Sequence, residues 1–207
     1  MELTQQDFKS ATSAVASKAM RNELNALIEG IEDPNAKRAF EAEMSSFYHL
    51  FNRFLAEKAK GVKLDWDKIQ PPAAEQVTPY ASLPQATDPS VLNKLAVLKL
   101  NGGLGTTMGC TGPKSIIEVR EGMTFLDMSV RQIEHLNGTY NVNVPFILMN
   151  SFNTDDDTAR VIQKYANHNV EIMTFNQSRY PRINRDTLLP CPRSATSNKN
   201  LWYPPGH

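Results

Sequence analysis

The stretch LAVLKLNGGLGTTMGCTGPKS, residues 95–115, begins as a short apolar run and continues as a glycine-rich loop that leads to Lys114. Residues 95–100 have the length and composition of a strand that is buried on both faces. The loop includes the closely spaced glycines Gly102, Gly103, Gly105 and Gly109. Glycines permit backbone conformations that other residues avoid, and they let main-chain N–H groups approach an anion. The stretch therefore predicts a phosphate-binding site.

Two common glycine motifs fit this loop poorly. The dinucleotide fingerprint G-x-G-x-x-G needs a glycine where this chain has Met108, and the next glycine, Gly109, comes one place late. The P-loop pattern places glycine directly before its lysine, whereas Pro113 stands before Lys114 here. A dehydrogenase-like domain stays a weaker alternative, because the second strand-like run is followed by Arg120 rather than by an acidic partner for the ribose.

Length and composition favour a globular protein with no net charge, so any phosphate site must depend on local charges. The chain has 207 residues, 41% of them hydrophobic, which is enough to bury a core. Lys+Arg and Asp+Glu both number 22, so no nucleic-acid or membrane partner is expected from net charge. There is no apolar run of about 20 residues and no apolar leader at the start, and we expect a cytoplasmic protein. The two cysteines, Cys110 and Cys191, are too far apart in the sequence to suggest a disulfide framework or a zinc site.

The first part of the chain, residues 1–61, predicts a helical appendage. Its second helix is marked at both ends, because Asp33 precedes a proline, as at a helix N-terminus, and Gly61 follows the last turn. Between them, apolar residues recur at alternating steps of four and three: Phe40, Met44, Phe47, Phe51 and Phe54. Residues 62–93 are rich in proline and predict an extended connector without regular elements.

Residues 94–207 alternate between strand-like and helix-like segments. The strand-like runs are residues 95–100, 115–119, 145–149 and 170–175. One helix is predicted from Thr124, with Phe125, Ser129, Ile133 and Leu136 facing inward, and another follows a cap at Thr154. Alternation at this spacing favours an α/β fold with a mostly parallel, doubly wound sheet and right-handed crossovers. Such sheets bind ligands beyond the carboxyl ends of their strands, where the glycine loop and Gln177 fall.

The order strand, Asn-Gly-Gly-Leu-Gly-Thr, short spacer, Gly-Pro-Lys resembles the signature of sugar-nucleotide pyrophosphorylases. The form with Asn101 before the glycines and Ser115 after the lysine is similar to the eukaryotic UTP–glucose-1-phosphate uridylyltransferase family. Further segments agree with that family: residues 125–127, 132–137, 148–155, 174–183 and 202–207. The resemblance runs from about Phe47 to the last residue. It implies a Rossmann-like, GT-A-like nucleotidyltransferase domain over residues 94–207, with a sheet that is incomplete in this chain.

The resemblance also implies a reaction and a set of site residues. Glucose 1-phosphate would attack the α-phosphorus of UTP in line, which gives UDP-glucose and pyrophosphate. The implied UTP-binding residues are Leu100, Asn101, Gly102, Gly103, Lys114, Gln177 and Gly206. The implied sugar-phosphate-binding residues are Gly102, Gly103 and His207. Lys114 is the implied catalytic residue, since its charge would follow the triphosphate, and the Gln177 amide would contact uracil. Such transfers need positioning and charge neutralisation rather than a protein nucleophile.

Metal binding is expected outside this chain. The family uses Mg²⁺, and its magnesium-binding aspartate and a second lysine lie beyond the point that corresponds to residue 207. The chain does contain three successive carboxylates, Asp155, Asp156 and Asp157. At the start of a predicted helix, such residues complement the helix dipole more often than they bind a metal ion.

Because the family continues past Pro-Pro-Gly-His, we expect this chain to be truncated and inactive alone, binding UTP weakly at best. Full-length members are expected to form homo-oligomers through a C-terminal domain that is absent here. One alternative is a nucleotide-binding or regulatory module that keeps the pocket without catalysis. The sugar is also open, because related pyrophosphorylases use N-acetylglucosamine or galactose phosphates, and the Asn101 form favours glucose by resemblance alone.

Overall fold

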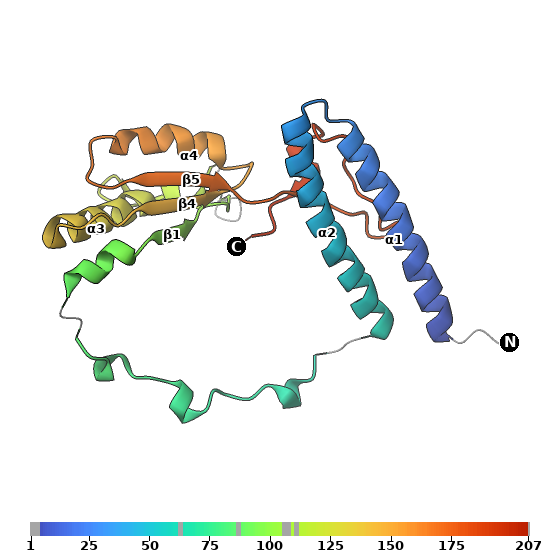
Figure 1. The fold of residues 1–207 in the computed structure, drawn as a ribbon, viewed down its shortest axis with the longest axis horizontal. Coiled ribbons are helices and arrows are strands. Elements are labelled where there is room, and N and C mark those ends of the chain that lie inside the picture. The colour runs from blue at the N-terminus through green and yellow to red at the C-terminus, as the bar shows by residue number, and fades with distance from the viewer. Residues whose placement is uncertain (1–4, 62–63, 86–87, 105–108, 110–111, 207) are drawn as a thin grey trace. The chain divides into compact units, whose positions relative to one another are not determined.

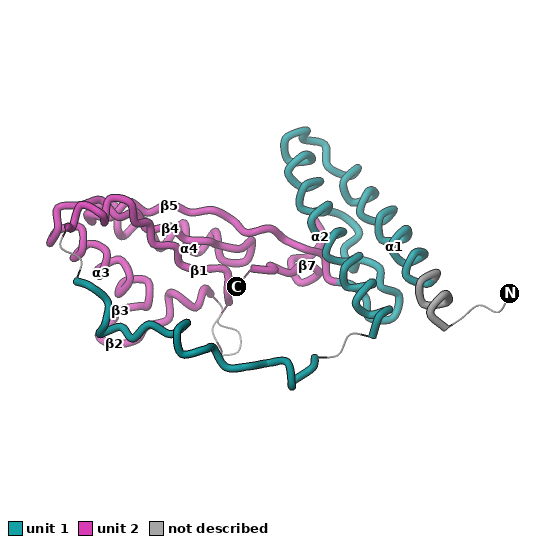
Figure 2. The backbone as a smooth tube through the Cα atoms, turned by 60° about the horizontal axis from the view of Figure 1, so that its bottom comes forward, with its two compact units in different colours: residues 1–87, 183–195 teal, residues 88–182, 196–207 magenta. Residues whose placement is uncertain are grey.

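The computed structural model divides the chain into two compact units, each described by itself below (Figure 2). The described residues are 5–61, 64–85, 88–104, 109 and 112–206, with only the backbone described for residues 5–11. The first unit comprises residues 1–87 and 183–195, and the second comprises residues 88–182 and 196–207. The functional domain boundaries predicted after residues 61 and 93 stay predictions.

The first unit is built on a pair of long helices, α1 (Gln5–Glu29) and α2 (Pro34–Lys60), which lie side by side (Figure 1). The predicted ends of α2 are confirmed. The Asp33 carboxylate accepts hydrogen bonds from two main-chain N–H groups of the first turn, at 2.7 and 3.1 Å. Gly61 ends the helix with φ 64°, in the left-handed region that favours glycine. Neither of these helices, nor any other helix in the described part of the chain, is long and apolar enough to span a membrane.

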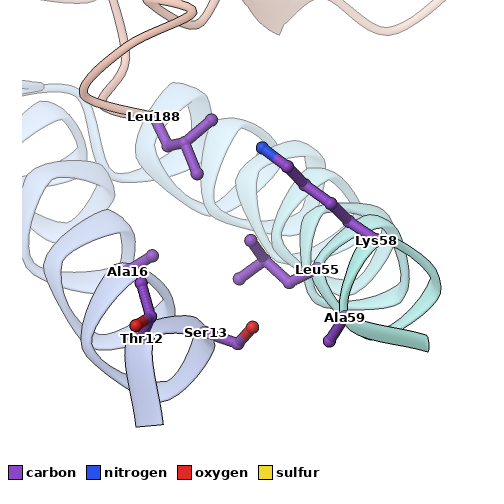
Figure 3. A pocket seen from close by; sticks show the side chains of 7 residues that line it. All are labelled: Thr12, Ser13, Ala16, Leu55, Lys58, Ala59 and Leu188. Atoms are coloured by element: carbon purple, nitrogen blue, oxygen red, sulfur yellow. The ribbon is translucent and has the colours of Figure 1, made fainter. Parts of the chain in front are cut away.

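Polar and apolar contacts join the two helices of this pair. The Ser17 hydroxyl hydrogen-bonds Tyr48 at 2.7 Å and Asn52 at 2.6 Å, and the Arg21 guanidinium lies 3.7 Å from the centre of the Tyr48 ring. Residues of both helices line a small pocket, and they include Ala16, Leu55 and Lys58 (Figure 3). Leu188, from the loop 183–195, also lines it. The pocket contains none of the predicted site residues.

Residues 64–85 have little regular structure, as predicted, but they contain short 3₁₀ turns. With the turn that follows in the second unit, these are Trp66–Lys68, Ala74–Gln76, Tyr80–Ser82 and Pro89–Lys94. The aromatic side chains in this stretch are open to solvent, since Trp66 is 72% and Tyr80 is 90% exposed. Proline limits the backbone to extended and turn conformations, which explains the absence of longer elements in the described part of this connector.

The second unit contains a three-stranded parallel sheet with the strand order β1-β4-β5 (Figure 1). Its strands are β1 (Val97–Leu100), β4 (Phe146–Asn150) and β5 (Ile172–Asn176). Helix α3 (Phe125–Tyr140) precedes β4, and α4 (Asp155–Ile162) lies between β4 and β5. Two short antiparallel pairs complete the unit: β2 (Glu118–Arg120) with β3 (Met123–Thr124), and β6 (Tyr180–Pro181) with β7 (Trp202–Tyr203). The predicted mixed α/β fold with a parallel sheet is confirmed.

The two faces of this sheet differ. Phe146 and Leu148 are fully buried in a core to which α3 and α4 both contribute. Alternate residues along a strand point to opposite faces, so Leu98, Ile147 and Met173, which are paired in register, lie on the other face. Leu98 and Met173 are exposed there. The described helices therefore cover one face, and the doubly wound arrangement stays a prediction.

Helix α3 buries part of the predicted side. Ile133 is buried and Leu136 packs against the core, as predicted, whereas Phe125 is exposed. The helix also buries Leu126, Val130 and Asn137. Thr124 forms a capping box with Asp127, so Phe125 is the first helical residue. Leu126 and Val130 are then one helical turn apart on the side that faces the sheet.

Asp127 links the start of α3 to the segment after α4. Its carboxylate accepts hydrogen bonds from the Thr124 N–H and from the Tyr165 hydroxyl, both at 2.8 Å, and lies 2.6 Å from the Lys164 ammonium. Burial alone would raise the pKa of Asp127, but the bonds from Lys164, Thr124 and Tyr165 outweigh it and hold the pKa well below its usual range. Burial and the Asp127 carboxylate raise the pKa of Tyr165. At neutral pH, Asp127 is therefore a carboxylate and Tyr165 a neutral donor.

We expect Asp127→Asn to lower the free energy of unfolding by about 1–2 kcal/mol at pH 7, since it removes a charge-assisted hydrogen-bond acceptor. Because the folded-state pKa is depressed, the contribution is complete above about pH 5 and is lost as the pH falls below about 4. Urea unfolding from pH 7 to pH 3 should therefore show a shallower decline for the variant. Exposed Asp156 provides the control, and Asp156→Asn should change stability by less than about 0.5 kcal/mol. Parallel pH profiles for Asp127→Asn and the wild type would contradict this role.

Candidate functional site

The carboxyl ends of the three parallel strands bring several predicted site residues together. Asn101 directly follows β1, and its main-chain N–H donates to the Met149 carbonyl of β4 at 2.8 Å. Gln177 directly follows β5, and its main-chain N–H donates to the Asn150 carbonyl at 2.9 Å. These bonds continue the sheet pairing past the end of β1 and β5. The glycine loop and Gln177 therefore begin at one edge of the sheet, as parallel strands require.

The Gln177 side chain lies against two of the predicted glycines. A Cβ added to Gly102 would come within 2.1 Å of Gln177 Nε2, and one added to Gly206 would come within 2.8 Å of Gln177 Oε1. The Gly206 N–H donates to that Oε1 at 2.5 Å. Gln177 Nε2 is buried and has no hydrogen-bond partner within the described ranges. A buried amide donor thus lies against Gly102 with nothing in the described chain to receive its hydrogen bond.

Lys114 lies beside the same loop. Its main-chain N–H donates to the Gly103 carbonyl at 3.1 Å, and Leu104 pairs with Pro113 in an antiparallel bridge. The two ends of the loop are therefore held together, and its intervening residues 105–108 and 110–111 lie outside the described part. The Lys114 side chain is exposed, and no carboxylate of the described chain forms an ion pair with it. Its charge is available to a ligand.

The strand predicted at residues 115–119 is wrong over its first half. Lys114–Ile116 form a 3₁₀ turn, and β2 begins at Glu118. Pro113 sets the entry to this turn, and the Ser115 side chain is buried because its hydroxyl donates to the Asn101 side chain. In a continuous strand, side chains would alternate between the two faces, and Ser115 would not form this inward bond.

The structure describes most of the implied binding residues but not all. Leu100, Asn101, Gly102, Gly103, Gln177 and Gly206 gather at the strand ends, and Lys114 is bound to Gly103 through its main chain. Asn101 is 3% exposed, so its side chain is closed to a ligand. His207 lies outside the described residues, as do Gly105 and Cys110. The roles assigned to all these residues stay predictions.

Sequence reasoning missed a set of buried polar side chains below the loop. Asn150, Ser151 and Thr158 are all buried, and each takes part in a hydrogen bond with Asn101 or Gly102. Asn150 and Ser151 directly follow a run of apolar strand residues, which is the signal that could have identified them. The predicted cap Thr154 also differs, because its hydroxyl accepts from the Ser151 N–H at 3.0 Å instead of capping α4.

The three successive aspartates have different partners. Asp155 accepts from Asn150 Nδ2 at 2.9 Å, Asp157 pairs with Arg160, and Asp156 lies 3.9 Å from the Lys199 ammonium. Within the described ranges, no group of three or more His, Cys, Asp or Glu side chains is placed to hold a metal ion. The described residues therefore do not fit a protein-held Mg²⁺ ion, and we assign no step of the chemistry to one.

Comparison with known proteins identifies the family. The family model for UTP–glucose-1-phosphate uridylyltransferase matches residues 44–207, which is most of the chain. The chain belongs to this family. It is 59% identical over 202 residues to a probable UTP–glucose-1-phosphate uridylyltransferase of Schizosaccharomyces pombe, and 54% identical over 202 residues to the UTP–glucose-1-phosphate uridylyltransferase of Saccharomyces cerevisiae. Each match covers 97% of this chain and 40% of the relative, so the chain spans less than half the length of these uridylyltransferases.

Solved uridylyltransferase structures share the fold. The chain is 29% identical to a UDP-glucose pyrophosphorylase of Leishmania major, with a TM-score of 0.65 over 93% of this chain and 38% of that one. It is 30% identical to a UDP-glucose phosphorylase of Trypanosoma brucei, with a TM-score of 0.62 over 93% of this chain and 39% of that one. The mixed α/β unit with its parallel sheet is thus consistent with a nucleotidyltransferase-like fold.

Proposed function

We propose that this chain forms the UTP-binding part of an enzyme that converts UTP and glucose 1-phosphate to UDP-glucose and pyrophosphate. The observation that supports it most directly is the Gln177 amide, which meets Gly102 and Gly206 at the strand ends and keeps a buried donor without a partner in the described chain. A buried donor without a partner costs roughly 1–3 kcal/mol, so an acceptor on a ligand would recover that cost. A carbonyl of uracil provides such an acceptor.

The glycines would let the phosphates of the nucleotide approach main-chain groups of the loop. Gly102 leaves no room for a side chain between the loop and Gln177, so a ligand there meets main-chain groups. Lys114, held to Gly103, would place its ammonium on the triphosphate and neutralise charge as the α-phosphorus is attacked in line. A neighbouring sugar phosphate would use Gly102, Gly103 and His207, as the family resemblance implies. Proximity and charge would thus carry the reaction without a protein nucleophile.

We also propose that the three strands are part of a larger, doubly wound Rossmann-like sheet of the GT-A type. The apolar face with Leu98 and Met173 supports this, since an apolar sheet face normally packs against another layer. The two relatives are longer than this chain, and their additional residues are available to form such a layer. The expectation that residues 1–207 do not turn over alone stays a prediction.

Calorimetric titration with UTP and CTP in the presence of magnesium tests the proposed site. We expect Lys114→Ala to weaken binding of both nucleotides about tenfold or more, because both carry the triphosphate. Gln177→Ala should weaken UTP more than CTP, because its amide reads the base. Lys94→Ala, an exposed lysine of the same unit, is the matched control for loss of charge and should bind like the wild type.

Two outcomes would contradict the proposal: no UTP binding by the wild type at millimolar concentration, or equal affinities for Lys114→Ala and Lys94→Ala. Assay of UDP-glucose formation with the same preparations separates a catalytic chain from a nucleotide-binding module. Product formation that Lys114→Ala abolishes would also contradict the expected inactivity of residues 1–207.

A further inference from the structure

The Asn101 side chain makes three hydrogen bonds in the interior below the glycine loop. Its Nδ2 donates to Asn150 Oδ1 at 2.7 Å and to Thr158 Oγ1 at 2.8 Å. Its Oδ1 accepts from the Ser115 hydroxyl. These four side chains come from four different segments of the second unit, and all are buried. Since both amide hydrogens and the oxygen have partners, the side chain has one satisfied orientation.

The bonds continue to a group that can only accept. Asn150 uses its Oδ1 for Asn101, and its Nδ2 donates to the Asp155 carboxylate at 2.9 Å. If the Asn150 amide turned over, its oxygen would face the carboxylate and its NH₂ group would face the NH₂ group of Asn101. The Asp155 carboxylate therefore fixes the direction of the bonds, which run from Ser115 through Asn101 and Asn150 to Asp155.

This directed series of bonds touches the candidate site at three points. Ser115 is the residue after Lys114. The Asn150 carbonyl accepts from the Gln177 main chain, and the neighbouring Ser151 hydroxyl donates to the Gly102 carbonyl at 2.8 Å. Gln177 and Gly102 are thus each one hydrogen-bonded or covalent step from the Asn101–Asn150 pair, and Lys114 is two steps away, through Ser115. A change in the direction of the amides would disturb all three together.

We propose that Asn150 and Asp155 are positioning residues for the nucleotide site, which they serve by fixing the orientation of the Asn101 amide. This inference rests on the proposed UTP site. Asp155 acts as a hydrogen-bond acceptor for the Asn150 amide, not on a metal ion or on the ligand. The buried Asn101 side chain acts as the link between the end of β1 and the turn that carries Lys114, while its main chain remains at the ligand side of the loop.

Moving the carboxylate from one end of the series to the other tests the proposal. In Asn101→Asp, a carboxylate oxygen replaces the NH₂ group that donates to Asn150 Oδ1, so this oxygen loses its donor. If the Asn150 amide turned over to donate to the new carboxylate, its oxygen would face the Asp155 carboxylate. No arrangement satisfies both ends. In the double variant Asn101→Asp with Asp155→Asn, the reversed series is satisfied, because position 155 now donates and position 101 accepts from Asn150 and Ser115. The Thr158 hydroxyl, which donates to the Thr154 carbonyl at 2.7 Å, turns to donate to position 101. All the side chains involved keep their shape, so packing changes little.

We expect Asn101→Asp to weaken UTP binding by about 10-fold to 100-fold, and the double variant to recover about tenfold of that loss. Asp155→Asn alone should weaken UTP binding by about threefold to tenfold, less than Asn101→Asp, because an asparagine can accept from Asn150 but no longer excludes the reversed orientation. Asn176→Asp, at the exposed end of β5, adds the same charge at the same edge of the sheet and controls for repulsion of the phosphates. It should bind UTP more tightly than Asn101→Asp does.

Hydrogen exchange of the main-chain amides of Gly102, Gly103 and Lys114, measured without ligand, gives a second readout. Exchange should be faster in Asn101→Asp and return toward the wild-type rate in the double variant. If the wild type fails to bind UTP, the proposed function is wrong, while the exchange rates still test the orientation of the amides. Additive losses, with the double variant no better than Asn101→Asp in either measurement, would overturn the positioning role.

Discussion

Gly102→Ala is expected to weaken UTP binding by about 100-fold, because a displacement near 1 Å at a reacting site can cost that much. The added Cβ would lie 2.1 Å from Gln177 Nε2 and 3.4 Å from the Ser151 Cβ, so the glutamine amide must move. Gln177 is long enough to swing away, and the fold should survive the change. What is lost is the position of the Gln177 donor beside the loop. Calorimetric titration with UTP measures the loss.

Gly138→Ala provides the matched control for this substitution. Gly138 lies within α3, and a Cβ added there meets nothing within 4 Å. Alanine in a helix is favoured over glycine, so this variant should bind UTP normally and gain about 0.5–1 kcal/mol in stability. A Gly102→Ala protein that binds UTP as well as Gly138→Ala would show that Gln177 and the loop do not share a nucleotide site.

Local sequence signals predicted the elements whose ends depend on neighbouring residues. The ends of α2 follow from Asp33 with its proline and from Gly61, and the structure confirms both. The strands β1, β4 and β5 follow from short apolar runs between polar loops, although their ends shift by one or two residues. The strand predicted at residues 115–119 failed over residues 115–117, where β-branched residues favoured a strand. There, a hydrogen bond from Ser115 to Asn101, 14 residues away in the sequence, outweighs the local preference.

The candidate site shows the same division between local and distant causes. The positions of the glycine loop and Gln177 could be expected, since parallel strands bring their carboxyl ends to one edge. The partners of the Asn101 side chain could not, because Asn150 and Thr158 lie 49 and 57 residues away. The sequence pattern also places Asp155 in a helix's first turn, where a role toward the helix dipole is the usual one. Only the geometry reveals its bond to Asn150.

Phe146→Ala is expected to lower the free energy of unfolding by about 3–5 kcal/mol, which is a large part of the roughly 5–15 kcal/mol of a typical domain. Phe146 is 0% exposed and lies in the core that α3 and α4 share with the sheet. Removal of its ring would lose apolar burial and leave a cavity between β4 and the helices. Urea unfolding followed by circular dichroism measures the change.

Phe175 is the control that tests the assignment of the two sheet faces. It lies in the neighbouring strand β5, opposite Met149 in register, and is 46% exposed on the face that the described helices leave open. Phe175→Ala should therefore cost less than about 1 kcal/mol, since its ring is only partly removed from water. A shift of the β4–β5 pairing by one residue would bring Phe175 to the helical side of the sheet. Equal losses of stability in the two variants would indicate that alternative register, and with it a different approach of Gln177 to Gly102.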